Sequence, residues 1–545
     1  MTPWPDSFAN RYRRAGHWRD KSLGELLRSS ARNHAAAPAL RWEDRCWSYG
    51  ELDSRSDRMA AGLLELGITP GDRVVVQLPN VPVFFALLFG LFRLGAVPVF
   101  ALPSYRRNEI VDLCRITEAT AYVVPATDAE SDFDYRVLAG EVVAQVPSLR
   151  HVLVAGDPGH FTALADIDAE PRQSLAAPAS DQLALLLASG GTTGVPKLIP
   201  RTHNDYFYLQ HACAELCALT PASVYLAVLP IGHQFALACP GVLGTFYKGG
   251  TVALSPSPRP RQVFEAIERF RVTITSAVPP LAMLWAQAAA YSTADLTSLE
   301  VLQVGGARLP EEAARTVNNA FGGALQQVYG MSEGLLSLTR RDDPPQTVLS
   351  TQGLPLSPDD ELRVVDDSDN EVEPGMVGRL LVRGPYTVRG YFRSPEYNRT
   401  AFTDDGFYRT GDLVRLTPAG RIVVEGREKD LVNRAGVKIS TEEVQDHLRS
   451  HPAIADAALI PLPDALMGER ACACIVLRDG YKDVPDLAEY LRQRGLATYK
   501  TPDTVRVFDS LPLTSIGKID KRELIHTLTQ PQKTPTTTVN GSAPS

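Results

Sequence analysis

The order of apolar and polar residues along the chain predicts alternating helices and strands. Between residues 50 and 66, apolar side chains recur at helical spacing, and Gly67 ends the pattern. Short apolar runs that are typical of buried strands lie at residues 74–78, 121–124, 151–154 and 183–188. Strands that alternate with helices at this spacing predict a mostly parallel sheet covered by helices.

The pattern changes after Pro385. Residues 389–392 and 407–412 are rich in turn formers, short strands are expected at 413–416 and 421–424, and the polar stretch 426–430 is typical of a linker. Beyond the linker we expect a small α+β domain, with helices at 441–450 and 484–494 and strands at 457–460 and 471–477.

The predicted fold class is therefore α/β. We expect a large N-terminal domain (residues 1–428) of helix-covered mixed sheets with a β-rich subdomain, followed by a small α+β C-terminal domain (429–529). The last residues, 530–545, are biased toward Thr, Pro and Ser, and we expect this tail to be disordered.

Composition narrows the function classes. The chain has 545 residues, 44% hydrophobic and 22% charged, with a net charge of −8 and no long basic block, so nucleic-acid binding has no electrostatic support. Seven cysteines in a chain of this length do not form a disulfide framework. The start has no signal-peptide pattern, and the apolar run 84–99 is broken by Arg93 and Pro98, so we expect a cytoplasmic protein without a membrane span.

One glycine-rich stretch offers chemistry suited to a polyphosphate. The apolar run 183–188 is followed by three glycines, which let the backbone bend sharply and bring its N–H groups against an anion. Three hydroxyl side chains and one lysine in the same stretch add further donors. The candidate phosphate-binding residues are Ser189, Gly190, Gly191, Thr192, Thr193, Gly194 and Lys197. A flexible surface turn is the alternative interpretation. A Walker loop is excluded, because Val195-Pro196 precedes the lysine and Leu198 follows it.

The stretch Ser-Gly-Gly-Thr-Thr-Gly-Val-Pro-Lys resembles the phosphate loop of the adenylate-forming superfamily, which comprises acyl-CoA ligases, luciferases and adenylation domains of peptide synthetases. Its continuation, Leu198 to Tyr206, resembles the stand-alone aryl-acid adenylating enzymes of siderophore and related pathways. The resemblance extends from about the first thirty residues to near Leu528. It implies ATP and Mg²⁺ as cofactors and a C-terminal domain that moves as a lid.

The resemblance also implies a nucleotide site. Tyr329 offers a flat face for adenine, and Glu333 is a hard oxygen ligand suited to Mg²⁺. Asp412 would accept hydrogen bonds from the ribose hydroxyls, with Arg427 as a second ribose contact. The further ATP-binding candidates are Gly306, Ala307, Val328, Gly330, Met331 and Ser332. Taken alone, each of these stretches is also compatible with an ordinary turn.

Two lysines have roles implied by the resemblance alone. Lys518, in Pro-Leu-Thr-Ser-Ile-Gly-Lys-Ile-Asp, would carry the adenylation step, because its single charge can bridge the attacking carboxylate and the α-phosphate. Without the matching flanks it would be taken for a solvated loop lysine. Lys429 would be the hinge about which the small domain rotates between two half-reactions.

The expected acid pocket departs from the family pattern. Residues 230–241 resemble the acyl-pocket helix of aryl-acid ligases, but Gln234 stands where an asparagine is common. Cys239 and Leu336 replace a typical serine and valine, so a second ring hydroxyl would be poorly accommodated. We therefore expect a salicylate-like acid rather than 2,3-dihydroxybenzoate. The candidate acid-binding residues are His233, Gln234, Phe235, Cys239, Gly305 and Leu336.

The sequence thus predicts an aryl-acid–AMP ligase that passes its product to a phosphopantetheine thiol on a separate carrier protein, in siderophore or other nonribosomal peptide biosynthesis. An aryl- or acyl-CoA ligase is the nearest alternative, and 2,3-dihydroxybenzoate, 3-hydroxypicolinate and 3-hydroxyanthranilate are alternative acids. A P-loop phosphotransferase is disfavoured by the loop sequence, and a catalytically dead relative by the presence of Lys518 and Glu333. Monomer and homodimer both stay open.

Overall fold

The structure is a computed structural model. It describes residues 2–128, 132–171, 175–189, 196–428, 431–434, 437–464, 468–481, 483–494, 496, 500–514 and 517–529. Three sets of predictions lie outside these residues: the loop residues Gly190, Gly191, Thr192, Thr193 and Gly194, the hinge Lys429, and the tail 530–545.

The chain forms two compact units. The large unit comprises residues 1–410 and 414–424, and the small unit comprises residues 411–413 and 425–545. The predicted domain boundary between residues 428 and 429 stays a prediction, because residues 429 and 430 are not described.

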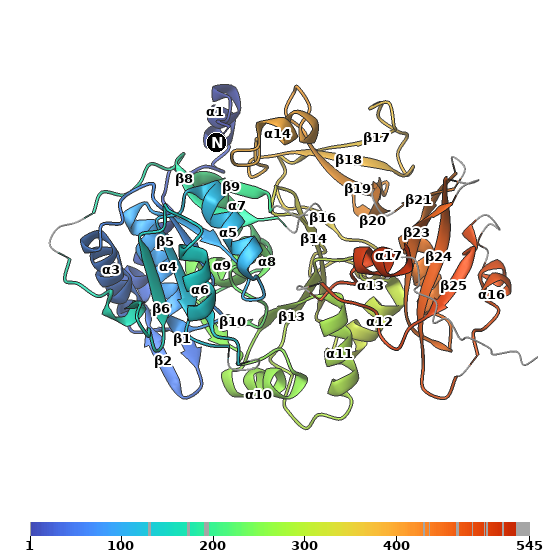
Figure 1. The fold of residues 1–545 in the computed structure, drawn as a ribbon, viewed down its shortest axis with the longest axis horizontal. Coiled ribbons are helices and arrows are strands. Elements are labelled where there is room, and N and C mark those ends of the chain that lie inside the picture. Colours follow the sequence, from blue (N-terminus) through green and yellow to red (C-terminus); the bar gives the residue numbers. More distant parts are fainter. Residues whose placement is uncertain are drawn as a thin grey trace, which may run out of the picture. The chain divides into compact units, whose positions relative to one another are not determined.

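A seven-stranded sheet in the large unit has the order β7-β6-β5-β3-β4-β8-β9. Its strands β5, β6, β8 and β9 are labelled in Figure 1. Its paired strands are parallel except for β8 and β9, which are antiparallel. The strands are β3 (Arg73–Val76), β4 (Val97–Phe100), β5 (Ala121–Pro125), β6 (His151–Ala155), β7 (Thr162–Ala163), β8 (Leu183–Ala188) and β9 (Leu198–Thr202). The predicted strands at 121–124, 151–154 and 183–188 are confirmed, whereas the strand predicted at 74–78 spans Arg73–Val76.

Local sequence signals define the helices of this region. The Ser48 side chain accepts from Glu51 N and the Glu51 carboxylate from Ser48 N, which starts α3 (Tyr49–Glu65) with a capping box. Helix α4 (Pro82–Leu94) has proline in its first turn and ends at Gly95, whose φ is +76°. The other helices are α1 (Asp6–Arg14), α2 (Leu23–His34), α5 (Arg107–Thr117) and α6 (Tyr135–Val143), with the short 3₁₀ helix η1 (Leu164–Asp166).

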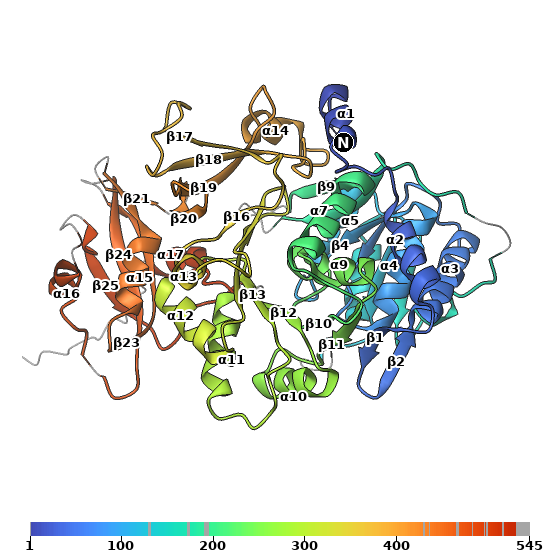
Figure 2. The same cartoon turned by 180° about the vertical axis from the view of Figure 1, so that it is seen from behind.

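A nine-stranded sheet, visible from behind in Figure 2, has the order β16-β15-β14-β13-β12-β10-β11-β1-β2. Its central strands are parallel, and β2, β15 and β16 pair antiparallel to their neighbours. The strands are β1 (Pro38–Trp42), β2 (Arg45–Ser48), β10 (Val224–Ala227), β11 (Thr251–Leu254), β12 (Ile274–Ala277), β13 (Val301–Gly305), β14 (Leu325–Gly330), β15 (Leu336–Leu338) and β16 (Leu354–Pro355). The helices are α7 (His203–Leu216), α8 (Gln234–Ala238), α9 (Gly241–Tyr247), α10 (Pro260–Phe270), α11 (Pro279–Ala289), α12 (Glu311–Ala320) and α13 (Pro345–Ser350).

A four-stranded sheet follows, with the order β17-β18-β19-β20 and helix α14 (Pro395–Ala401) before its third strand. The strands are β17 (Glu361–Val365), β18 (Gly378–Arg383), β19 (Tyr408–Leu416) and β20 (Ile422–Arg427). Two predictions were wrong here. Residues 408–412, expected as turns, belong to β19, because Tyr408 is buried at 7% exposure and extends the alternation of the strand. Gly426 and Arg427, expected in a linker, complete β20.

The small unit contains a five-stranded sheet in the order β22-β21-β24-β23, with β25 paired to β24. Its strands are β21 (Leu431–Arg434), β22 (Val437–Ser440), β23 (Ile454–Asp464), β24 (Gly468–Leu477) and β25 (Thr504–Val507), and its helices are α15 (Thr441–Arg449), α16 (Leu487–Gln493) and α17 (Lys521–Thr529). Helix α16 is shorter than predicted, because Asp486 caps it by accepting from Glu489 N. The predicted α/β fold class with a small α+β unit is confirmed.

The cysteines differ sharply in exposure. Cys46, on β2, is exposed, and the other six are buried thiols without a disulfide. Among the described residues there is no cluster of three or more His, Cys, Asp or Glu that could hold a metal, and no helix that could cross a membrane.

Candidate active site

The turn between β14 and β15 positions Glu333. The strands pair antiparallel, with Tyr329 opposite Ser337, and Met331 N donates to Leu335 O at 3.1 Å. A Cβ at Gly330 would lie 2.8 Å from both Leu335 O and Leu336 Cδ1, so only glycine fits where the chain enters this turn. Strand and turn thereby place six consecutive candidates together: Val328, Tyr329, Gly330, Met331, Ser332 and Glu333.

Glu333 is held by a chain of tyrosine hydroxyls. Its side chain is buried at 8% exposure, and its Oε1 accepts a hydrogen bond from the Tyr391 hydroxyl at 2.6 Å. The Tyr391 and Tyr408 hydroxyls are 2.9 Å apart. Burial and the nearby Glu333 carboxylate raise the pKa of Tyr391, so the phenol stays protonated and donates. Sequence reasoning missed both tyrosines, because 58 and 75 residues separate them from Glu333 and no local pattern links them.

Arg201 connects this turn to the strand that follows the glycine-rich stretch. Its side chain on β9 has 0% exposure, and Nε donates to Asp205 Oδ1 at 2.8 Å. Nη1 donates to Ser332 O at 2.9 Å, next to Glu333. Asp205 also accepts from Thr202, which caps helix α7. Arg201 is a further site residue that the sequence did not single out, although a charged residue inside an apolar strand pattern was a usable signal.

The glycine-rich stretch is closed at its base. Ser189 N donates to Lys197 O at 2.8 Å, so both ends of the stretch are tied together. The buried Ser189 Oγ makes no hydrogen bond to any described residue. An orphaned hydroxyl at this point is suited to an external acceptor such as a phosphate oxygen.

Gly305 brings the end of β13 close to the predicted acid pocket. A Cβ at Gly305 would lie 2.7 Å from Val328 O and 3.2 Å from Phe235 Cζ. Gly306 follows with φ of +84° and is exposed together with Ala307. The structure therefore gathers Gly305, Val328 and Phe235, which were predicted to contact adenine and acid.

Helix α8 carries the next acid-pocket candidates, and it is shorter than the stretch 230–241 that resembles the acyl-pocket helix. His233 is exposed, and its Nδ1 accepts from Phe235 N at 3.3 Å as the cap of α8. Gln234 is buried at 4% exposure, and its Nε2 donates to Met331 O at 3.0 Å. Among the described residues, Gln234 Oε1 has no hydrogen-bond partner. Because the Met331 carbonyl oxygen can only accept, it binds the NH₂ group of the Gln234 amide. The Gln234 amide oxygen therefore points away from Met331 O.

Cys239 and Leu336 are buried members of the same apolar core cluster. Cys239 follows α8, and burial raises the pKa of its thiol to about 12, so it stays neutral. Leu336 N donates to the Tyr386 hydroxyl at 3.1 Å, and that hydroxyl donates to Asp360 Oδ2 at 2.6 Å. Burial raises the pKa of Asp360 to about 7.

The small unit holds the two predicted ribose contacts next to each other. Asp412 is buried at 4% exposure, and Arg427 Nε donates to its Oδ1 at 3.0 Å. The guanidinium fixes the carboxylate on strand β19, while most of the arginine side chain faces solvent.

Lys518 lies in a tight turn of the small unit. Thr514 N donates to Lys518 O at 2.6 Å, and Lys518 N donates to Thr514 Oγ1 at 3.1 Å. Gly517 has φ of +75°, which glycine adopts without strain. The two hydrogen bonds therefore tie the backbone of Lys518 to Thr514.

The donor set at Glu333 fits a magnesium ion. Mg²⁺ is usually bound through one or two carboxylates together with substrate phosphates, rather than by an all-protein cage. A single carboxylate held in place by Tyr391 matches that requirement.

Comparisons with known proteins cover nearly the whole chain. Residues 27–392 match the family model of the AMP-binding enzyme, and residues 443–518 match the AMP-binding enzyme C-terminal domain. The 2,3-dihydroxybenzoate-AMP ligase of Bacillus subtilis is 52% identical over 96% of this chain and 97% of its own length. The salicyl-AMP ligase / salicyl-S-ArCP synthetase of Mycobacterium tuberculosis is 48% identical over 97% of this chain and 94% of its own.

The apo structure of MbtA from Mycobacterium smegmatis is similar, with a TM-score of 0.76 and 46% identity over 96% of this chain and 98% of that one. These matches confirm the predicted adenylate-forming superfamily. The chain belongs to the AMP-binding enzyme family.

Proposed function

We propose that the chain is an aryl-acid–AMP ligase. It joins an aromatic carboxylic acid to ATP, giving aryl-AMP and pyrophosphate, and then transfers the aryl group to a thiol. The observation that carries this proposal is the likeness to a 2,3-dihydroxybenzoate-AMP ligase, 52% identical over 96% of the chain. The orphaned Ser189 hydroxyl and the fixed Glu333 carboxylate are the groups that a polyphosphate with its metal requires.

In the first half-reaction, the acid's carboxylate oxygen attacks the α-phosphorus of ATP. The bond from this phosphorus to the bridging oxygen breaks, and pyrophosphate leaves. Ser189 and Lys197 bind phosphate oxygens, Tyr329 stacks on adenine, and Asp412 accepts from the ribose hydroxyls. Glu333 would hold Mg²⁺, which neutralises phosphate charge when bound. Lys518 stabilises the charge that develops between carboxylate and α-phosphate.

Gln234 supports an acid with a donor group next to its carboxylate. Its amide N–H is engaged by Met331 O, so the side chain offers the pocket a buried acceptor. An ortho hydroxyl or amino group would satisfy this acceptor, whereas a ring nitrogen, itself an acceptor, would leave two acceptors facing each other. Salicylate fits this requirement, and the buried neutral Cys239 offers little to a second hydroxyl.

In the second half-reaction, the thiol sulfur attacks the aryl carbonyl carbon, the bond to the AMP oxygen breaks, and AMP leaves. We propose that this thiol belongs to a phosphopantetheine group on a carrier protein, in siderophore or related peptide synthesis. CoA, which carries the same thiol arm, is the alternative acceptor. Rotation of the small unit about Lys429 would exchange the groups needed by the two steps.

Acid-dependent ATP–pyrophosphate exchange tests the first half-reaction. The panel is salicylate, 2,3-dihydroxybenzoate, 3-hydroxyanthranilate, 3-hydroxypicolinate and picolinate, with benzoate as the acid that lacks an ortho group. We expect salicylate to have the highest specificity constant and picolinate and benzoate the lowest. Absence of exchange with every aryl acid contradicts the proposed activity. A thioester assay with a holo carrier protein and with CoA then identifies the acceptor.

A further inference from the structure

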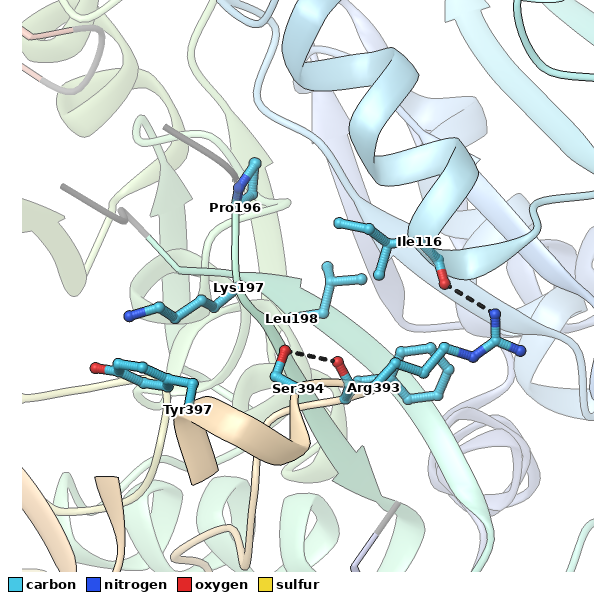
Figure 3. A pocket seen from close by; sticks show the side chains of 8 residues that line it. Ile116, Pro196, Lys197, Leu198, Arg393, Ser394 and Tyr397 are labelled. Carbon is cyan, nitrogen blue, oxygen red and sulfur yellow. Dashed lines mark hydrogen bonds between the residues drawn. The ribbon is translucent and has the colours of Figure 1, made fainter. Parts of the chain in front are cut away.

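Lys197 lies on the face of an aromatic ring. Its Nζ is 3.2 Å from the centroid of the Tyr397 ring, and 5.8 Å from that of Tyr391. Figure 3 shows the lysine side chain extended above Tyr397, which α14 presents to it. At this distance the ammonium group is in direct contact with the negative face of the ring.

The same two rings connect Lys197 to the carboxylate site. The rings of Tyr391 and Tyr397 pack edge to face at 5.3 Å with an interplanar angle of 60°. Tyr391 in turn donates its hydroxyl to Glu333 Oε1 at 2.6 Å. Tyr397 thus contacts both the lysine and the residue that fixes the candidate metal ligand.

Lys197 also borders a cavity of about 320 Å³ that Pro196, Phe392, Arg393 and Tyr397 help to line. Arg393, the other cation there, donates to Glu118 Oε2 at 2.7 Å and to Ile116 O at 3.1 Å. In the part of the chain that the structure describes, no carboxylate lies within ion-pair distance of Lys197. The face of the Tyr397 ring therefore provides the electrostatic contact of the ammonium group.

The backbone around Lys197 is fixed, whereas its side chain has a flexible four-carbon stem. Lys197 O accepts from Ser189 N at 2.8 Å, and Leu198 O accepts from Phe392 N at 2.8 Å. The lysine side chain itself still has to be ordered before it can bind a phosphate. An aromatic face that restrains the ammonium removes part of that entropy loss from the binding step.

We propose that Tyr397 is a positioning residue that holds the Lys197 ammonium ready for the polyphosphate of ATP. This inference rests on the proposed function. The ring face contacts one side of the ammonium, and this contact does not involve the Tyr397 hydroxyl. The N–H groups on the other side can donate to phosphate oxygens while the ring contact persists, so the two interactions add rather than compete.

The test compares Tyr397→Leu, which removes the ring face, with Tyr397→Phe, which keeps it. Tyr291→Leu is the matched control, because Tyr291 is 91% exposed and outside the site. The dissociation constant of ATP is measured by calorimetry without acid, and the KM values for ATP and salicylate by pyrophosphate exchange. We expect Tyr397→Leu to raise the dissociation constant and KM of ATP by about three- to tenfold. The KM of the acid should change less than about twofold, and Tyr397→Phe should recover most of the ATP affinity.

The Lys197→Ala variant, with and without Tyr397→Leu, completes a double-mutant cycle. Tyr397→Leu should have no further effect on ATP binding once the ammonium is gone. Tighter ATP binding by Tyr397→Leu would show that the ring competes with phosphate, and this overturns the proposal. An equal rise in the KM of the acid would indicate general damage to the site and would also overturn it. If the wild-type protein exchanges pyrophosphate but Tyr397→Leu behaves like the control, the inference fails alone. If the wild type shows no exchange with any acid, the proposed function fails.

Discussion

The Glu333 region of the large unit and the Lys518 turn of the small unit differ in how they hold their candidate functional groups. In the large unit, Glu333 is fixed by the Tyr391 hydroxyl at 2.6 Å and Arg201 by Asp205 at 2.8 Å, so buried side chains position one another. In the small unit, Lys518 belongs to a turn closed by Thr514 through a backbone bond of 2.6 Å and a hydroxyl contact of 3.1 Å. The difference indicates a division of labour. Substitutions in the large unit should change stability together with binding, whereas loss of the Lys518 side chain should change rate alone.

The largest expected effect tests whether the large unit's buried polar groups govern stability. Asp360 has its pKa raised to about 7 by burial, compared with about 3.9 in an unfolded chain. The folded state therefore binds the proton more tightly, so this contribution is fully present below about pH 4 and is lost as the pH rises through 7. At about 1.4 kcal/mol per pH unit, the loss is on the order of 4 kcal/mol.

Asp360→Asn keeps an acceptor for the Tyr386 hydroxyl but does not titrate. Urea unfolding at pH 4, 6.5 and 8 should show near-equal stability of the two proteins at pH 4, a more stable variant at pH 6.5 and the full difference at pH 8. If the free energy of unfolding depends on pH in the same way in wild type and variant, Asp360 does not cause the pH dependence. The contrast between the two units would then be weaker.

The next largest effect concerns Lys518. Lys518→Ala should lower the rate of aryl-AMP formation by on the order of a hundredfold or more, as for loss of an oxyanion donor. Because the turn is closed by the backbone and Thr514, the urea midpoint should not move. Pyrophosphate exchange measures the first step, and single-turnover transfer from pre-made aryl-AMP measures the second, which should change far less. Equal loss in both steps would point to a structural role instead.

A smaller effect is expected at Tyr391. Tyr391→Phe removes the hydroxyl that donates to Glu333 and leaves a buried carboxylate with one partner fewer. A hydrogen bond to a charged group contributes about 1.5–3 kcal/mol, so the large unit should melt earlier and the enzyme should need more Mg²⁺ for half-maximal exchange. Calorimetric melting and a Mg²⁺ titration measure the two effects. A change in only one of them would break the link between stability and binding that the comparison predicts.

The smallest effect concerns the choice of acid. Cys239→Ser supplies a donor and an acceptor in the pocket, and Leu336→Val opens about one methylene of space. Together they should raise the specificity constant for 2,3-dihydroxybenzoate relative to salicylate by at least about tenfold, with the serine contributing most. Pyrophosphate exchange with both acids provides the ratio. Preference of the wild-type enzyme for 3-hydroxypicolinate or 3-hydroxyanthranilate would refute the salicylate prediction and leave the ligase proposal intact.

Sequence was most informative where a pattern is local. The strand at 183–188 and the helix at 50–66 have periodicity, caps and glycine stops within one short window, and the structure contains both almost as predicted. At the start of β19 the sequence predicts turns, because Thr410, Gly411 and Asp412 are turn formers. Pairing with β18 and burial of Tyr408 override that local preference.

The candidate site shows the same limit. The family motifs pointed to Glu333, Gln234 and Met331, but not to the Tyr391 hydroxyl that holds Glu333 or to the contact of Met331 O with Gln234, because each of these contacts joins separate segments of the chain. Sequence reasoning also missed Arg201, whose Nε and Nη1 donate to Asp205 and Ser332, because no local pattern shows that the Ser332 carbonyl, 131 residues away, lies beside β9.

The exposure of the cysteines has a practical consequence. Cys46 lies in the open on β2, whereas the other six thiols are buried. A thiol-reactive dye should therefore attach to the native protein at one place, on a hairpin strand that carries none of the candidate site residues. The wild-type chain can thus carry a single fluorophore without the removal of any cysteine. The slower reaction of the six buried thiols would then measure how often the structure around each of them opens.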